Sequence, residues 1–122
     1  MPVRPLDDLL CGIDRVDVLK VDVEGAEGLV LDGGTHVLGT LRPTLLCEFS
    51  PDSLVERSGR SGVRFVDQLM ELGYDLARLT GSGERVRLAD GAEALQAHAA
   101  QGGTHIDLWC EPSEGRGRPR LP

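Results

Sequence analysis

Apolar residues along this chain recur with two periods, which together predict strands and helices in alternation. Short runs rich in Val, Leu and Ile that end in turn residues are typical of strands, whereas apolar residues three and four positions apart are typical of one face of a helix. Runs of the first kind predict strands over 16–24, 44–49, 74–80, 84–90 and 104–111.

Helical spacing occupies most of the chain between these strands. Over 26–41 it is interrupted at Gly33-Gly34, and two glycines inside a helix cost about 2 kcal/mol. We therefore expect a break at this pair and a second helical turn that Thr35 caps. After the strand that ends at 49, "SPDS" predicts a turn and "ERSGRSG" a flexible segment. The remaining helices are predicted over 6–13, 63–73 and 91–101.

The order of these elements predicts an α/β fold. Strand and helix units that alternate and end in a returning strand are the pattern of an open, mostly parallel sheet with helices on its faces. We expect one domain over 1–111 and a disordered tail over 112–122, where Gly, Pro and charged residues replace the apolar pattern.

Composition and charge exclude several classes of partner. The chain carries 20 acidic and 13 basic side chains, a net charge of -7, which argues against a nucleic-acid partner and leaves no polybasic membrane patch. No apolar run approaches the roughly 20 residues of a membrane span, and the N-terminus lacks a signal-peptide pattern, so we expect a cytoplasmic protein. The 3 cysteines and 3 histidines have no metal-ligand spacing, so we expect reduced thiols and no metal site.

The first strand carries the most unusual ionisable residues. Lys20 is the only lysine of the chain, and it stands in an apolar run. Alternation along the strand places it on one face with Asp22 and Glu24, so this face changes from apolar to ionisable toward the carboxyl end. Ligands of open α/β sheets bind outside the carboxyl ends of the strands. A structural alternative remains, in which Lys20 and Asp22 only form an ion pair.

Two further residues are candidates for binding a substrate. Glu48 interrupts an apolar strand near its carboxyl end, and a buried carboxylate without a partner would be costly, so Glu48 either reaches a cleft or finds a partner. His105 starts the last strand and is the histidine best placed to face a site, whereas His36 and His98 fit surface or capping roles.

The stretch "VDVLKVDVEGAEGLVLDGG", followed by "LRPTLLCEFS", resembles the C-terminal half of the FkbM family of S-adenosylmethionine-dependent methyltransferases. The resemblance is close over 5–50. Three parts of the family pattern match. The first is Leu6-Asp7, the second is the central motif over 20–27 with Leu31 and Gly33, and the third is Arg42-Pro43 followed by Glu48 in the next strand.

The resemblance implies a partial class I methyltransferase sheet, which is Rossmann-like, with strands four to seven and flanking helices. The strand over 16–24 would be the fourth, 44–49 the fifth, 74–80 the sixth and 104–111 the antiparallel seventh. Asp22 and Glu24 would then lie near the transferable methyl group and, with Lys20, act in catalysis by orienting or deprotonating a hydroxyl group. The implied function is O-methylation of a small-molecule or sugar acceptor.

The sequence departs from the family where the cofactor would bind. The family holds S-adenosylmethionine through a glycine-rich turn after its first strand, and no "D.G.n.G" pattern occurs here. We therefore expect the chain to lack the cofactor-binding half and to be inactive alone. The alternative is a non-catalytic α/β interaction module or a degenerate fragment. In either case the strand over 16–24 would be an exposed edge, which predicts a homodimer through this strand.

Overall fold

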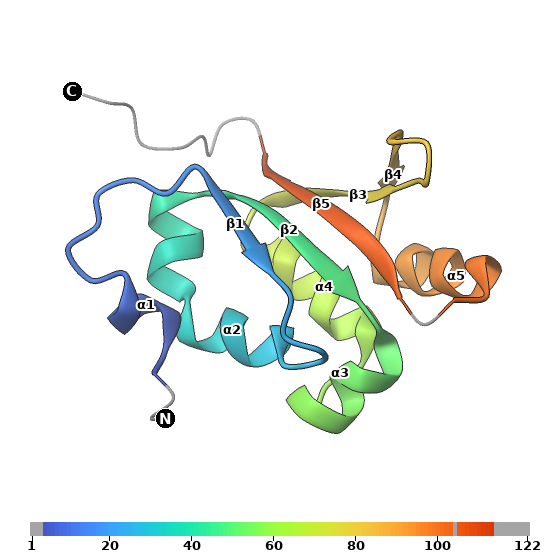
Figure 1. Cartoon of the computed structure of the whole chain (residues 1–122), viewed down its shortest axis with the longest axis horizontal. Coiled ribbons are helices and arrows are strands. Elements are labelled where there is room, and N and C mark those ends of the chain that lie inside the picture. Colours follow the sequence, from blue (N-terminus) through green and yellow to red (C-terminus); the bar gives the residue numbers. More distant parts are fainter. Residues whose placement is uncertain (1–3, 104, 114–122) are drawn as a thin grey trace.

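A computed structural model describes residues 4–103 and 105–113. The described strands form one five-stranded sheet in the order β1-β2-β5-β3-β4, with helices beneath it (Figure 1). β1 and β2 are parallel, whereas β5 is antiparallel to both β2 and β3, and β4 is antiparallel to β3. The strands are β1 (Val18–Val21), β2 (Thr44–Phe49), β3 (Tyr74–Leu79), β4 (Arg85–Leu88) and β5 (Ile106–Pro112).

The α/β class is confirmed, but the expectation of a mostly parallel sheet is wrong. Only one of the four pairs of neighbouring strands is parallel. β3 and β4 form a hairpin, closed by a hydrogen bond from the Thr80 amide to the Glu84 carbonyl oxygen, and antiparallel neighbours need only such a short turn. The returning strand β5 then lies between β2 and β3, which separates two strands that run in the same direction.

Six helices and helical turns connect the strands in the described part of the chain. The predicted helices near 63–73 and 91–101 are confirmed. The chain also contains a π-helical turn, η1, directly before β2. The helices are α1 (Leu6–Leu9), α2 (Glu27–Gly33), η1 (Val37–Leu41), α3 (Pro51–Ser58), α4 (Gly62–Glu71) and α5 (Gly91–Gln101).

The predicted turn at "SPDS" is wrong, because the chain forms α3 there. Ser50 occupies the N-cap position and Pro51 lies in the first turn, where its fixed φ favours a helix and its missing amide hydrogen costs nothing. Leu54 is fully buried, so packing against the core stabilises the helix. The predicted flexible segment is helical as far as Ser58, and the helix ends at Gly59 with φ 65°.

The predicted helix break at the glycine pair is confirmed, but its cap is not Thr35. α2 ends at Gly33, and helical structure resumes beyond Gly34. The Asp7 carboxylate accepts hydrogen bonds from the His36 and Val37 amides, at 3.0 and 2.9 Å. Asp7 therefore supplies the cap from a distant part of the chain and fixes α1 to the start of η1.

Arg42 joins the start of β2 to the end of α4. Its side chain is buried, and its guanidinium donates hydrogen bonds to the carbonyl oxygens of Leu72 and Gly73, the second at 2.6 Å. The guanidinium also lies 5.0 Å from the centre of the Tyr74 ring. The Tyr74 hydroxyl donates to the Pro43 carbonyl oxygen at 2.7 Å. The Arg-Pro step therefore has a structural role.

The core lies between one face of the sheet and the helices. Alternate strand residues point into it, and helices α2 to α5 and η1 each contribute side chains. Cys47 and Cys110 lie in this core, where a hydrogen bond between them and burial raise the pKa of Cys110. Other members are Val21, Leu31, Leu38, Leu45, Phe49, Leu54, Phe65, Val66, Leu69, Tyr74, Leu76, Leu88, Ala94, Ile106 and Leu108.

The described helices leave the opposite face of the sheet open. Val18 on β1 is 61% exposed, and Lys20 beside it is exposed as well. On β5, Trp109 is covered only partly, by the Arg85 guanidinium 4.4 Å from its ring centre. β1 is an edge strand of the sheet, as predicted. The homodimer through it stays a prediction.

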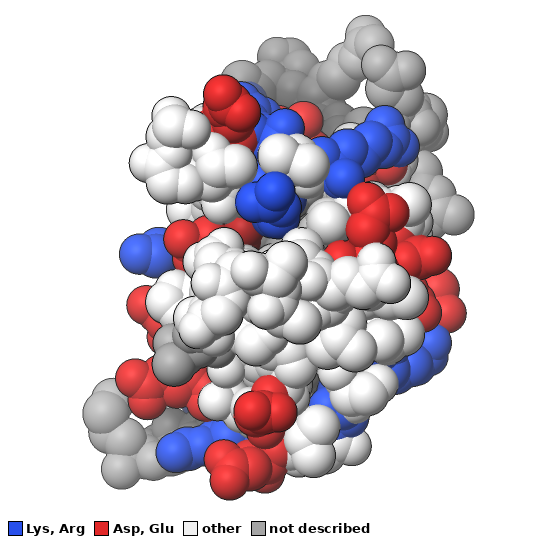
Figure 2. All heavy atoms as spheres, turned by 90° about the vertical axis from the view of Figure 1, so that its right-hand side faces the viewer, with Lys and Arg blue, Asp and Glu red and all other residues white. Residues whose placement is uncertain are grey.

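The surface beyond α5 has a different character. Figure 2 shows this side of the molecule, whose middle carries no Lys, Arg, Asp or Glu, while charged side chains gather around it. Leu95 of α5 is 40% exposed. Among the described residues, no helix is long and apolar enough to span a membrane. The disordered tail predicted over 112–122 begins too early, because Pro112 still belongs to β5. Its residues from 114 onward lie outside the described residues.

Candidate functional site at the ends of β1 and β2

The motif "KVDVEGAE" forms the end of β1 and a tight turn into α2. Gly25 in this turn has φ 100°, a conformation that favours glycine. A Cβ atom at this position would overlap the Ser53 carbonyl group in α3, so the turn packs directly against that helix. Glu24 also adopts a left-handed conformation, with φ 49°. The glycine of the motif is therefore required by the backbone.

Glu27 holds this turn from inside. The side chain is 2% exposed, and its two carboxylate oxygens accept hydrogen bonds from the amides of Val23, at 3.1 Å, and Gly25, at 2.9 Å. The Ser58 hydroxyl of α3 adds a bond to the Gly25 carbonyl oxygen at 2.5 Å. The third acidic residue of the motif is thus a structural anchor, and it fixes the segment that carries Asp22.

The three residues predicted to act in catalysis are placed differently. Lys20 lies exposed on the open face of the sheet. Asp22 follows β1 and lies close enough to Glu48 for its charge to raise the pKa of the Glu48 carboxyl group. Glu24 lies on the turn with its side chain exposed. Within the described residues, Lys20 and Asp22 form no ion pair, which argues against the purely structural alternative.

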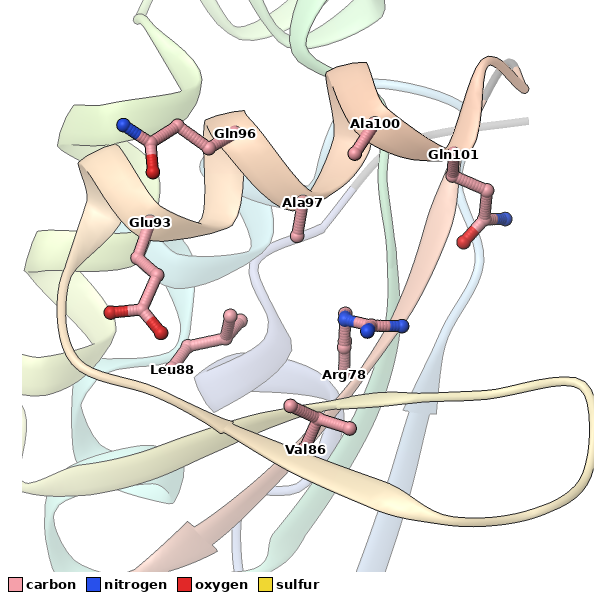
Figure 3. A pocket seen from close by; sticks show the side chains of 8 residues that line it. All are labelled: Arg78, Val86, Leu88, Glu93, Gln96, Ala97, Ala100 and Gln101. Carbon is pink, nitrogen blue, oxygen red and sulfur yellow. The ribbon is translucent and has the colours of Figure 1, made fainter.

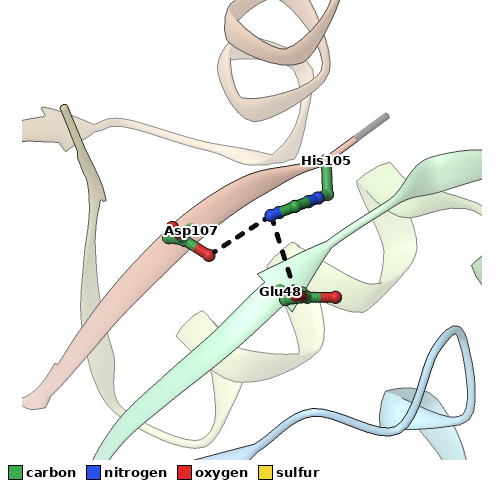
Figure 4. Close-up of side chains that lie close together, drawn as sticks. All are labelled: Glu48, His105 and Asp107. Carbon is green, nitrogen blue, oxygen red and sulfur yellow. Dashed lines mark ion pairs between the residues drawn. The ribbon is translucent and has the colours of Figure 1, made fainter. Parts of the chain in front are cut away.

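Glu48 and His105, the two predicted substrate-binding residues, lie together with a residue that was not predicted. The His105 Nε2 atom is 3.6 Å from the Glu48 Oε1 atom and 3.7 Å from the Asp107 Oδ1 atom. Figure 4 shows the imidazole ring before β5, with Nε2 directed toward both carboxylates. Glu48 and Asp107 are opposite each other across the β2–β5 pair.

The surroundings raise the pKa of the Glu48 carboxyl group above its ordinary value. Burial is the largest cause, because it disfavours the charged form. The negative charges of Asp22 and Asp107 raise the pKa further, and so does the hydrogen bond that a protonated Glu48 would make with the Asp22 side chain. His105 acts in the opposite direction and lowers it. The group is thus a half-buried carboxylate among other carboxylates, with one imidazole beside it.

A hollow of about 150 Å³ adjoins these side chains on the open face. It brings Lys20 to the same place as Glu48 and Asp107, because β1, β2 and β5 are neighbours in the sheet. Apolar side chains of β2 and β3 complete its lining. The lining residues are Lys20, Val21, Leu46, Cys47, Glu48, Leu79 and Asp107.

Asp107 could have been found only in part from the sequence. In "IDLWCE" the buried residues Ile106, Leu108 and Cys110 alternate with Asp107, so its place on the open face was predictable. The position of Asp107 opposite Glu48 was not predictable, because it depends on the register of β5 against β2.

Comparison with known families agrees with this architecture. A family model described as the methyltransferase FkbM domain matches residues 1–76, which is more than half of the 122 residues. The chain belongs to this family. The match covers the stretch from α1 through α4 into β3, and so includes both Asp22 and Glu48. Neither the search of curated proteins nor the search of solved structures found a match.

Methyltransferases in general use S-adenosylmethionine, so the volume of the hollows at the candidate site can be compared with the size of this cofactor. Pockets that enclose ligands of this size measure about 300–1,000 Å³. The hollow at Glu48 is about 150 Å³, and the larger hollow beside it, about 450 Å³, follows the free edge of β1 with mostly apolar lining. By volume, the hollow at Glu48 alone is therefore too small for the cofactor, whereas the hollow along β1 falls within this range.

Another hollow of the described structure lies away from this cluster. It measures about 550 Å³ and lies between the β3–β4 hairpin and α5, with Leu88 and Ala97 on its walls (Figure 3). Arg78 and Glu93 are its ionisable members. All of its lining residues come after the part of the chain that matches the FkbM family. The cluster at β1 and β2 is therefore the better candidate for a methyltransferase site.

Proposed function

We propose that this chain forms the acceptor side of an O-methyltransferase site that binds a hydroxyl group of a small molecule or a sugar. The observation that carries the proposal is the meeting of Asp22 and Glu48. These carboxylates come from neighbouring parallel strands, at the edge of the sheet where α/β enzymes place their ligands. The membership of the chain in the FkbM methyltransferase family supports it.

The chemistry follows from the carboxylates. Glu48 has a raised pKa and is therefore a stronger base than an ordinary glutamate, so it suits the removal of a hydroxyl proton as the oxygen becomes a nucleophile. Asp22 orients the same hydroxyl group. Lys20 lines the hollow and supplies a positive charge for the developing oxyanion. S-adenosylmethionine, when bound, would supply the methyl group.

Strand order supports the finer assignment of the fold. β1, β2, β3 and β5 would be the fourth, fifth, sixth and seventh strands of a class I methyltransferase sheet. β5 is antiparallel to its neighbours, as the resemblance implies for a seventh strand. Under this assignment Asp22 follows the fourth strand and Glu48 lies near the end of the fifth.

A kinetic experiment tests the role of the carboxylates. In an active methyltransferase that contains this chain, Asp22→Asn should lower turnover by about 10²- to 10⁴-fold, the usual effect of lost acid–base assistance. Asp17→Asn is the matched control, because Asp17 lies before β1 and its side chain pairs with the exposed Arg15 at 2.5 Å. Equal turnover of the two variants would remove Asp22 from the site.

A second candidate is a non-catalytic interaction module. The free edge of β1 and the exposed Val18 favour it, since unpaired strand edges pair with other chains. A module of this kind would associate through β1 and would tolerate Asp22→Asn without any change in function. The two candidates therefore differ in the response to one substitution.

A further inference from the structure

We propose that Glu48, His105 and Asp107 form a binding site for a divalent transition-metal ion, with Zn²⁺ as the best-suited ion. One possible ligand atom from each side chain can be chosen so that all three lie within 4.8 Å of one another. Figure 4 shows that the two carboxylates lie on different strands, with the imidazole between them. Three ligands are the usual protein share of a zinc site that keeps a position open.

Two of the three separations are close to those of a coordination shell, and all three are within 4.8 Å. Nitrogen and oxygen ligands bind Zn²⁺ at about 2.0–2.2 Å, so the corners of a tetrahedral site are roughly 3.3–3.6 Å apart. The His105 Nε2 atom lies 3.6 Å from the Glu48 oxygen and 3.7 Å from the Asp107 oxygen. Both contacts are too long for hydrogen bonds. Small side-chain rotations therefore suffice to close the three ligands around an ion.

The backbone holds the ligands firmly. Glu48 and Asp107 face each other in the antiparallel β2–β5 pair, in the interior of the sheet. Their neighbours Phe49 and Ile106 are paired in turn, and both are buried in the core. His105 directly precedes β5. Sites on rigid strands keep their geometry better than sites on loops.

The electrostatic surroundings favour a cation. Asp22 and Asp107 both act on Glu48 with like charge, and the position is partly removed from water. A divalent ion would neutralise these carboxylates. Lys20 is the positive group that lines the same hollow, and it forms no ion pair with these carboxylates among the described residues. The hollow of about 150 Å³ leaves room for a water or an acceptor oxygen as a further ligand.

The ligand set selects among metals. Imidazole suits Zn²⁺, Co²⁺ and Ni²⁺, whereas Mg²⁺ and Ca²⁺ are bound mainly by oxygen. No local spacing in the sequence indicates this site, because positions 48, 105 and 107 are brought together only by the register of β5 against β2. This explains why a metal site was not expected from the sequence.

Calorimetric titration of the purified chain with Zn²⁺ at neutral pH tests the proposal. All measurements use a Cys11→Ser background, because Cys11 is an exposed thiol that could bind zinc by itself. We expect saturable binding of one ion, weakened at least tenfold by each of Glu48→Gln, His105→Gln and Asp107→Asn. His36→Gln is the control for loss of a histidine and should leave the affinity unchanged.

Absorption by Co²⁺ provides the second measurement. A site of one imidazole and two carboxylates should give visible bands without the intense thiolate charge-transfer band in the near ultraviolet. Absence of saturable binding would overturn the inference. So would ligand variants that bind Zn²⁺ as tightly as the Cys11→Ser chain without them. Urea denaturation shows whether each variant is folded, so a lost affinity counts only for a folded chain.

The inference shares Glu48 with the proposed function, but its test does not depend on methyl transfer. A chain that binds Zn²⁺ through these residues but has no role in methyl transfer would keep the metal site and remove the proposed function. If Asp22 is needed for turnover but the chain binds no metal, the proposed function stands and the metal site is refuted.

Discussion

Glu27→Gln gives the sharpest test of how the motif "KVDVEGAE" builds the site. The substitution preserves the shape of the side chain but replaces one of the two carboxylate oxygens by an amide nitrogen. Each oxygen of Glu27 accepts one backbone hydrogen bond, from Val23 at 3.1 Å and from Gly25 at 2.9 Å. Glutamine has one acceptor oxygen, so one of these amides would then face a second donor.

The magnitude follows from these bonds. A hydrogen bond to a charged group contributes about 1.5–3 kcal/mol, and a buried donor without an acceptor costs about 1–3 kcal/mol. Because Glu27 is 2% exposed, water cannot easily replace the lost acceptor. We expect Glu27→Gln to lower the free energy of unfolding by about 3 kcal/mol, which combines one lost charged bond with partial relaxation of the turn.

Urea denaturation followed by circular dichroism measures this change, and an unaltered slope shows that the same transition is compared. Glu71→Gln is the matched control, because Glu71 is a glutamate with 61% of its side chain exposed that pairs with Arg64 at 3.0 Å. Exposed pairs of this kind contribute about 0–1 kcal/mol. If the two variants lose the same stability, the structural role assigned to Glu27 is wrong.

Three further predictions concern other parts of the molecule. Arg42→Lys removes the planar fork that reaches the Leu72 and Gly73 carbonyl oxygens, so the free energy of unfolding should fall by about 2–3 kcal/mol, and a loss no larger than that of the exposed Arg64→Lys would contradict the role of Arg42. Val18→Lys adds a charge to the exposed edge strand and should weaken self-association; light scattering over a concentration series checks this, and an unmodified chain that stays monomeric throughout would refute the homodimer. The isolated chain should show no saturable heat with S-adenosylmethionine in calorimetry, because no "D.G.n.G" turn occurs in its sequence, and micromolar binding would show that the cofactor is held in another way.

The sequence predicted those elements whose apolar pattern is decided locally. The strand over 44–49 matches β2 to the residue, and α4 ends near Gly73 as its helical spacing indicates. It failed where a local pattern has two meanings. Ser50-Pro51 is as typical of a turn as of a helix start, and the burial of Leu54 decides for the helix. The Asp7 cap of η1 joins residues about thirty positions apart, so no local pattern contains it.

In the candidate site, too, the sequence predicted the residues whose place follows from a local pattern and missed those placed by distant contacts. Alternation along β1 placed Lys20 on the open face, and the charge within an apolar strand marked Glu48. The alternation ends with β1 at Val21, so Glu24 follows the geometry of a turn and not the face of a strand. Asp107 joins the group only through the register of β5, which depends on contacts across the whole sheet.

The most direct test of the proposed acceptor site is to map ligand binding on the chain by NMR. A panel of sugars and small alcohols would be titrated into isotope-labelled chain while the backbone amide signals are followed. The account predicts that the shifted signals belong to residues at Asp22, at Glu48 and near His105. It also predicts that Asp22→Asn abolishes these shifts, whereas Asp17→Asn preserves them. Shifts confined to the hollow between the β3–β4 hairpin and α5, or no shifts with any member of the panel, would contradict it.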